Sequence, residues 1–314
     1  MIGEALRAFF SGAFGSWYAF GSGTLVRATP LILTGLSVAI AFRAGVFNIG
    51  AEGQLLMGAA AATAIALAAP TMPSVVLIPS LLIAGALAGA VWAAVAAVLR
   101  ERFHVLEVIS TIMLNFVAEY FVSYLVRGPL QEPTHVYPQT VTITAAAQLP
   151  RISATSRLHL GFALAIAACV AAWWIIRHTA AGFRLRAVGA NPFAARSAGR
   201  IDVVRTTYRA FVISGAIAGV AGAVEVSGVT YALYENLSPG YGFTAIAVAL
   251  LARLNALGVV ATGVLFGALE AGASAMQRDA GVPSVVVAVV EALIILAVLA
   301  VERARQLHAV VSPA

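Results

Sequence analysis

The chain has 314 residues, of which 61% are hydrophobic and 10% charged, against about 45–50% and 25% in ordinary soluble domains. A soluble core cannot bury that much apolar surface, whereas lipid accepts it, at about 20 apolar residues for each spanning helix. All 19 basic residues are arginine, which excludes a phosphate-loop lysine and a lysine Schiff base in this chain. We therefore expect a single transmembrane domain over residues 1–314, an all-α polytopic bundle with broken helices and about eight to ten spans.

Apolar runs between polar residues predict where the spans lie. The stretch 1–23 is apolar but interrupted by glycines, so its alternatives are a weak span, a re-entrant piece or an interfacial helix. The run 243–276 is too long for one span and contains Arg253, Asn255 and Gly258, which predicts a short half-helix, a break and a full returning helix. The other spans are expected at 24–42, 51–69, 74–99, 108–126, 158–176, 209–231 and 284–301.

The arginines predict how the bundle is oriented. Seven of them lie between Arg177 and Arg209, with Asp202 as the one acid, and the positive-inside rule makes the loop 177–209 cytoplasmic. Counting spans from there places the loop 127–157, rich in Thr and Pro, outside the membrane. Arginines scattered between apolar runs indicate membrane topology and contact with lipid head groups, and not nucleic-acid binding.

A polar interruption, RAGVFNIGAEGQ at 43–54, separates the first two regular spans. Unwound backbone at membrane depth is tolerated only where it is buried in protein or lines a cavity. Asn48 and Gln54 either hydrogen-bond a polar solute or hold the bend. Glu52 opens the following helix, where a carboxylate can cap free N–H groups; its alternative role is in the solute path.

The break inside 243–276 has the same order of residue types as the stretch around 43–54. In both, an apolar run, an arginine, an asparagine and a glycine precede a helix of small residues. Paired broken helices in two halves of a transporter mark the substrate path. The alternative is that two re-entrant bends resemble each other without a duplication.

A second polar row lies on the span 108–126. Thr111, Asn115 and Glu119 follow at four-residue intervals and so share one helical face,. They either line a solute path or form hydrogen bonds between helices. The isolated acids of other spans are expected to pair with arginines or to lie near an interface; they are Glu225, Glu270 and Glu291.

Motifs of enzyme chemistry are missing from the sequence. It contains no HExxH, GxSxG or paired-aspartate pattern, and its five histidines fall in predicted loops, span ends or the tail,. We therefore expect neither a catalytic centre nor a metal site.

The cytoplasmic loop contains a turn followed by a short helix. Asn191 and Pro192 form the turn, with the proline at the first helical position,. Ala194 and Ala195 follow, and side chains of that size suit a helix that lies against another protein. The alternative is that the loop serves topology and lipid contact alone.

Four motifs in order carry a family resemblance: GVFNIGAEGQLLMGA at 45–59, EVISTIMLN at 107–115, FRLRAVGANPFAARSAGRI at 183–201 and GYGFTAIAVALLARLNALG at 240–258. Together they resemble the permease subunits of bacterial ABC importers of the branched-chain amino acid and simple-sugar group, most closely the nucleoside and simple-sugar permeases. The resemblance runs from Thr24 to the end of the chain. The stretch before it is short for the further first helix that such permeases have.

The resemblance implies a multi-pass protein of the bacterial inner membrane. Its implied partners are a cytoplasmic ATP-binding cassette subunit, a second permease in a homo- or heterodimer, and an extracytoplasmic solute-binding protein. It implies no cofactor in this chain, because the partner subunit uses the ATP. The first expected solute is a nucleoside, with a simple sugar or a branched-chain amino acid as alternatives and an ion-coupled secondary transporter as the rival class.

Two groups of candidate residues follow from the motifs and the resemblance. The substrate-path candidates are Asn48, Glu52, Gln54, Thr111, Asn115 and Glu119. The candidates for coupling to the ATPase are Gly189, Asn191, Pro192, Ala194, Ala195, Ser197 and Asp202.

Overall fold

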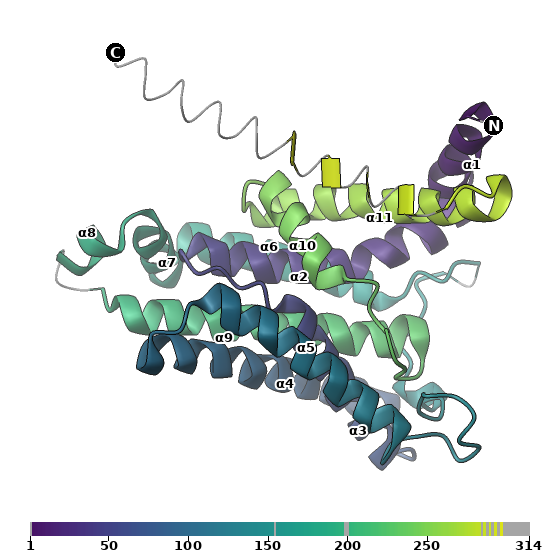
Figure 1. Cartoon of the computed structure of the whole chain (residues 1–314), viewed down its shortest axis with the longest axis horizontal. Coiled ribbons are helices and arrows are strands. Elements are labelled where there is room, and N and C mark those ends of the chain that lie inside the picture. The colour runs from purple at the N-terminus through teal and green to yellow at the C-terminus, as the bar shows by residue number, and fades with distance from the viewer. Residues whose placement is uncertain are drawn as a thin grey trace.

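The structure is a computed structural model that describes residues 2–153, 155–197 and 201–283, together with single positions between 285 and 297. The described part is a bundle of helices (Figure 1), and its β-pairing is limited to two isolated bridges. The helices in chain order are α1 (Ile2–Phe14), the π-helical η1 (Ala19–Leu25), α2 (Val26–Arg43), α3 (Ala51–Ala68), α4 (Ser74–Phe103), α5 (Glu107–Arg127), the short 3₁₀ helix η2 (Ala145–Ala147), α6 (Leu160–His178), α7 (Ala180–Ala190), α8 (Pro192–Ser197), α9 (Val203–Glu225), the π-helical η3 (Val226–Thr230), α10 (Tyr241–Leu251) and α11 (Ala256–Ala280).

Seven helical stretches in the described residues are long and apolar enough to cross a membrane. They coincide with the predicted spans, and α10 and α11 form the expected half-helix and returning helix on either side of a break at 252–255. The predicted all-α polytopic bundle with broken helices is thus confirmed. The expected span at 284–301 lies outside the continuously described residues.

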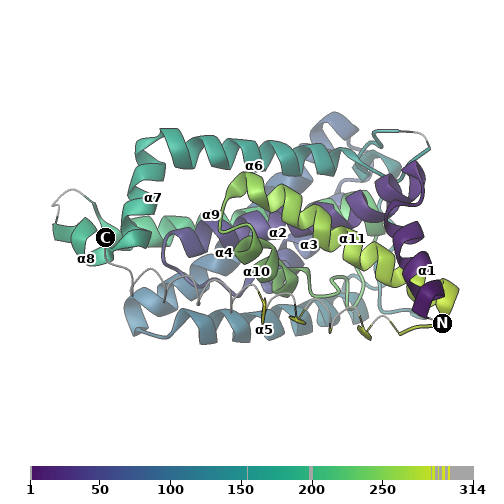
Figure 2. The same ribbon diagram turned by 90° about the horizontal axis from the view of Figure 1, so that it is seen from above.

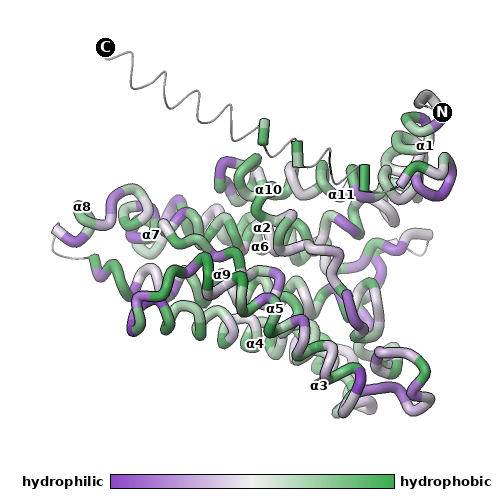
Figure 3. Tube along the Cα trace, viewed as in Figure 1, coloured by the Kyte–Doolittle hydropathy of each residue, from purple (hydrophilic) through white to green (hydrophobic). Residues whose placement is uncertain are grey.

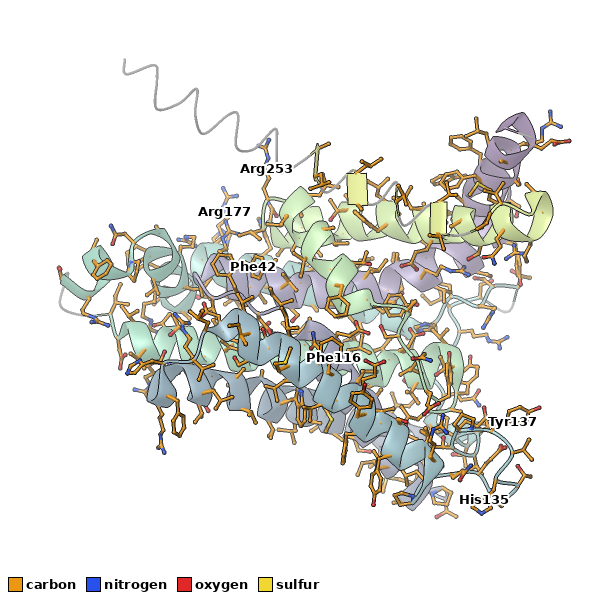
Figure 4. All side chains as sticks on the ribbon, viewed as in Figure 1. Phe42, Phe116, His135, Tyr137, Arg177 and Arg253 are labelled. Atoms are coloured by element: carbon orange, nitrogen blue, oxygen red, sulfur yellow. The ribbon has the colours of Figure 1, made fainter. Side chains whose placement is uncertain are left out.

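The long helices run along one axis of the molecule, so that the two predicted loops lie at opposite ends (Figures 1 and 2). One end carries α7 and α8, and the other carries His135 and Tyr137 of the loop 127–157 (Figure 4). The hydropathy colouring places the most polar stretches near these two ends, with apolar helices between them (Figure 3). This separation suits a bundle whose middle is surrounded by lipid.

Helix α1 lies across the end of the bundle that carries residues 127–157, roughly perpendicular to the long helices (Figure 2). It packs on α11, while Leu6, Phe10 and Phe14 are each more than half exposed. Of the three alternatives for the N-terminal stretch, this arrangement fits an interfacial helix, which lies in the membrane surface with its apolar side chains in the lipid boundary.

The bundle has an inner and an outer layer. In α2 with η1, 89% of the most apolar window is buried, against 22% in α6 and 28% in α5. The inner helices α2, α3 and α9 therefore hold the polar segments, since polar groups at membrane depth need protein partners. The outer helices expose apolar side chains, as contact with lipid requires.

Glycines bring α4 and α9 into backbone contact. A methyl group added at Gly89 would lie 2.2 Å from the carbonyl oxygen of Gly215, and one at Gly219 would lie 2.0 Å from that of Gly85. Close backbone approach through small residues is how helices associate in lipid, where no hydrophobic force drives them together. The glycine pairs therefore fix α9 in the centre of the bundle.

Candidate functional site

The bend at 44–50 is held by a pair of side-chain amides. Asn48 Nδ2 donates to Gln54 Oε1 at 2.9 Å, and Gln54 Nε2 donates back to Asn48 Oδ1 at 3.0 Å. Asn48 Nδ2 also donates to Ser214 Oγ at 2.8 Å, and the N–H of Gly50 donates to Asn48 Oδ1 at 3.0 Å. Asn48 is fully buried and Gln54 is 1% exposed. Of the two roles that the sequence left open for this pair, the geometry favours holding the bend.

Ser214 extends this network into the inner helices, and sequence reasoning missed it. Its hydroxyl lies 2.9 Å from that of Ser37, which joins α9 to α2. A serine in an apolar helix is too common to identify a network, because its partner depends on the neighbouring helix. The network thus connects the first bend to the two most buried spans.

Asn115, on α5, holds the end of the bend and the first turn of α3. Its Oδ1 accepts from the N–H of Gly53 at 2.9 Å, and its Nδ2 donates to the carbonyl of Ile49 at 2.9 Å. Thr111 turns back to its own helix and donates to the carbonyl of Glu107 at 2.7 Å. Thr111 and Asn115 therefore do share a buried face, which packs against the bend.

The prediction that Glu52 caps its own helix, α3, is wrong. The N-cap residue of α3, Gly50, makes no side-chain cap, and Asn115 accepts from the N–H of Gly53. Glu52 Oε2 instead accepts from the N–H of Gly242 at 2.6 Å, in the first turn of α10. A carboxylate at a helix N-terminus satisfies a free N–H and faces the positive end of the helix dipole. Glu52 therefore fastens the second broken helix to the first.

A cavity of about 160 Å³ lies beside this contact. Glu52, Asn115 and Glu119 line it, together with the loop that leads into α10. Glu119 is exposed, whereas the other two are buried. The structure thus brings three of the six substrate-path candidates together around one cavity, while Asn48, Gln54 and Thr111 are engaged inside the bundle.

The loop 177–209 forms a second site at the far end of the bundle. Thr179 caps α7 by accepting from the N–H of Gly182 at 3.2 Å, and Asp202 caps α9 by accepting from the N–H of Arg205 at 2.9 Å. Asn191 Oδ1 accepts from the N–H of Ala194 at 3.0 Å and so starts α8. The predicted turn and short helix are present, with Pro192 at the first helical position; residues 198–200 lie outside the described part.

The side chains that α8 presents differ from the expected ones. Ala194 and Ser197 are exposed, but Ala195 is only 4% exposed and packs inward, which corrects the expectation that both alanines face a partner. Phe193 is 80% exposed, and sequence reasoning missed it. The sequence feature that could have pointed to Phe193 is that it is the one aromatic residue of α8, directly after the proline that starts the helix.

Gly189 joins this second site to both bends. A methyl group added to it would lie 2.0 Å from the carbonyl oxygen of Arg43, at the end of α2. Arg43 in turn donates from Nη1 to the carbonyl of Leu254 at 3.0 Å, inside the break between α10 and α11. The view with side chains places Phe42, Arg177 and Arg253 toward the same end of the molecule (Figure 4). Both breaks are therefore physically connected to the helix pair α7 and α8.

Membrane-length helices around two interrupted helices define the class of polytopic membrane transport proteins. The sequence profile of the family described as "Branched-chain amino acid transport system / permease component" matches residues 21–299, and the chain belongs to that family.

Similar proteins cover most of the chain. It is 42% identical over 94% of its length to the guanosine ABC transporter permease protein NupP of Bacillus subtilis, covering 85% of that protein. It is 41% identical over 87% of its length to the glucose ABC transporter permease protein TsgB13 of Haloferax volcanii, covering 74%. It is 36% identical over 91% of its length to the nucleoside ABC transporter permease protein NupB of Lactococcus lactis, covering 80%. No solved structure matches it significantly. The chain is a multi-pass permease subunit of the ABC transporter class.

Proposed function

We propose that this permease imports nucleosides across the bacterial inner membrane. The observation that carries the proposal is the 42% identity over 94% of the chain to a guanosine permease, supported by the similarity to a second nucleoside permease. A simple sugar is the second candidate, because the identity to a glucose permease is 41%.

The energy comes from a cytoplasmic ATP-binding cassette subunit that docks on α8. The exposed Phe193 and Ala194 form the contact surface, and the Asn191 cap fixes its direction. The chain has no lysine, so a phosphate loop has to reside in that partner. The permease itself uses no cofactor.

The docking surface drives transport through the backbone contacts behind it. A displacement of α7 presses Gly189 on the end of α2, and Arg43 passes the displacement to the break at Leu254. Packed elements transmit such shifts because a close-packed contact has no room to absorb them. Both broken helices then move together.

Two further partners complete the importer. A second permease forms the other half of the transmembrane dimer, and an extracytoplasmic solute-binding protein docks at the end that carries residues 127–157. This end holds acceptors and donors in a fixed arrangement, since Glu132 accepts from the side chains of Thr134 and Gln139. The hydrogen bonds from Gln139 and Thr134 hold the pKa of Glu132 below its usual value, so its negative charge persists to lower pH than that of a free glutamate.

Uptake by the complete complex in proteoliposomes tests the proposal. With ATP on the side of the membrane that carries the ATPase subunits, labelled guanosine should accumulate on that side. Excess glucose should leave guanosine uptake unchanged. Accumulation of glucose in place of guanosine would make the sugar the solute. Uptake driven by an ion gradient without the ATPase subunit would overturn the ATP-driven class.

Variants of α8 test the docking surface. Phe193→Glu should abolish guanosine-stimulated ATP hydrolysis while the permease remains inserted, because it replaces an apolar contact with a charge. The matched control is Phe103→Ala, which removes an aromatic side chain that is 67% exposed at the end of α4. Full ATPase stimulation in Phe193→Glu would place the docking surface elsewhere.

A further inference from the structure

A second cavity, larger and more polar, lies toward the end of the bundle that carries residues 127–157. It has a volume of about 530 Å³ and opens between α2, η3, α10 and α11. The first turn of α10 separates it from the smaller cavity, because Tyr241 lines the larger one and Phe243 the smaller one. Asn236 lines both cavities. The two cavities therefore follow each other along the bundle, with only the start of α10 and its leading loop between them.

Four ionisable residues line the larger cavity. Arg27 and Arg157 provide two basic groups, and Glu225 and Glu270 provide two carboxyl groups. Glu225 is 3% exposed and interacts electrostatically with both arginines. Charged side chains at membrane depth are costly and by default mark a functional path. Because basic groups, carboxyl groups and hydroxyls all line the cavity, it suits a solute with many hydrogen-bond donors and acceptors,.

Hydrogen bonds hold these groups in place. Arg27 donates from Nη2 to Ser274 Oγ at 3.3 Å, and Ser274 Oγ donates to the carbonyl of Glu270 at 2.9 Å. The N–H of Arg157 donates to Ser22 Oγ at 2.9 Å, which ties the outer loop to η1. The hydrogen bonds of the cavity wall thus join three segments that are far apart in the sequence: residues 22–27, Arg157 and residues 270–274.

Two of the wall elements are π-helical. Ser22 belongs to η1, and Val229 and Thr230 belong to η3. A π-helical turn is rare, and it is found frequently at functional sites. That two of them border the same cavity is a second indication, independent of the charges, that this place is kept for a ligand.

The side chains match the two halves of a nucleoside. Carboxylates such as Glu225 accept hydrogen bonds from ribose hydroxyls, as acidic residues do in dinucleotide sites. The rings of Tyr234 and Tyr241 offer flat faces on which a base can stack, and Asn236 can both donate to a base edge and accept from it. The volume lies in the range of about 300–1,000 Å³ that small-molecule sites occupy.

We propose that this cavity is the site inside the membrane where the nucleoside is held on its way through the permease. Glu225 and Glu270 face the ribose, and Tyr234 and Tyr241 face the base. The solute then passes the first turn of α10 toward Glu52 and the smaller cavity. The choice of a nucleoside rests on the proposed function above, whereas the position of the cavity does not.

Uptake and ATP hydrolysis by the complete complex in proteoliposomes, measured side by side, test this site. Glu225→Gln should lower guanosine uptake about tenfold, the loss expected for one hydrogen bond. ATP hydrolysis stimulated by the loaded binding protein should stay within about twofold of wild type, because the docking surfaces are untouched. Tyr234→Leu should lower uptake, and Tyr234→Phe should restore it. The matched controls are Glu101→Gln and Tyr120→Phe, at the end of α4 and on the exposed face of α5; both should transport normally.

Cysteine labelling gives a readout that does not depend on transport rates. In a Cys169→Ala background, Thr244→Cys, in the cavity wall, should react with a maleimide more slowly when guanosine is present during turnover. Thr134→Cys, in the exposed outer loop, should react equally fast with and without guanosine. Normal uptake by Glu225→Gln together with unprotected labelling of Thr244→Cys would overturn the site. If wild type carries glucose, and glucose gives the same protection and the same loss of uptake, the cavity stands and the nucleoside assignment fails.

Discussion

The two broken helices of this permease resemble each other in sequence but are held in opposite ways. The bend at 44–50 is fixed by buried side chains, with Asn48 and Gln54 in a reciprocal amide pair. The break at 252–255 is fixed by backbone and caps: Arg253 and Leu254 take left-handed conformations with φ of 51° and 58°, and the exposed Asn255 caps α11. Non-glycine residues adopt that conformation at a cost of about 1 kcal/mol or more.

This difference indicates which of the two breaks moves. A buried network loses several hydrogen bonds at once if it opens, whereas an exposed cap can exchange its partners for water. Arg43 is the tie between the breaks, through its hydrogen bond to the carbonyl of Leu254. We therefore expect the first bend to act as a rigid support and the second to act as the hinge.

The largest effect is expected from breaking the support. Asn48→Leu leaves the side chain of Gln54 and the N–H of Gly50 without partners, and it leaves Ser214 with Ser37 alone. At about 1–3 kcal/mol for each buried unpaired group, the loss of stability should reach roughly 3–5 kcal/mol. The thermal unfolding midpoint of the purified permease in detergent measures it. A loss no larger than that of Asn255→Ala would show that the two breaks are equally anchored.

A smaller effect on stability, with a large effect on transport, is expected at the contact between the loop 177–209 and the first bend. Gly189→Val places a side chain against the carbonyl of Arg43 and should cost about 1–3 kcal/mol through overpacking. ATP-driven uptake should fall further than stability does, because α7 can no longer press on the end of α2. Ala190→Val, at an exposed neighbouring position, is the control and should leave uptake unchanged.

The hinge is expected to tolerate change better. Asn255→Ala removes the acceptor for the N–H groups of Leu257 and Gly258, at 3.0 Å and 3.3 Å, and should cost about 1 kcal/mol. Asn255→Ser, which can still cap, should recover most of the loss. Unfolding curves of the three proteins at one pH compare the effects; an alanine variant as unstable as Asn48→Leu would contradict the hinge.

The smallest effect is expected from the ion pair that anchors the loop leading into α10. Arg127 donates from Nη2 to Glu235 Oε2 at 2.8 Å, and Ser123 donates to the same carboxylate. These hydrogen bonds lower the pKa of Glu235 from its usual 4.5 to about 2.

The sign of the pH dependence follows from that shift. A lowered folded-state pKa stabilises the protein above the unfolded-state pKa of about 4.5, and this contribution disappears as the pH falls toward about 2,. Unfolding midpoints between pH 5 and pH 2 should therefore decline more steeply for wild type than for Glu235→Gln. Parallel curves would show that the exposed pair does not anchor the loop.

Much of the architecture could be predicted from local sequence. The apolar runs located the helices, the arginines distinguished the two ends, and the polar stretch 43–54 marked the first bend. The turn at Asn191 and Pro192 was recognisable because a cap and an N-terminal proline act within a few residues. Each of these features depends on neighbours in the chain, so the local pattern was sufficient.

The roles of the polar side chains could not be predicted in the same way. Glu52 had the right position to cap its own helix, but its partner is the N–H of Gly242, 190 positions away. Asn115 bonds Gly53 across 62 positions, and Asn48 bonds Ser214 across 166. The inward turn of Ala195 and the exposure of Phe193 depend likewise on where α7 and α9 pack.

The sequence by itself determined that this chain is a helical membrane permease with two broken helices and a short helix in the loop 177–209, because hydropathy, charge distribution and caps act locally or over whole segments. Only the tertiary structure decided which polar side chains hold the bends and which, such as Glu225 and Glu270, lie in the wall of a cavity. The reason is physical: in a lipid-surrounded bundle each buried polar group needs a partner, and the partner is supplied by whichever helix packs beside it.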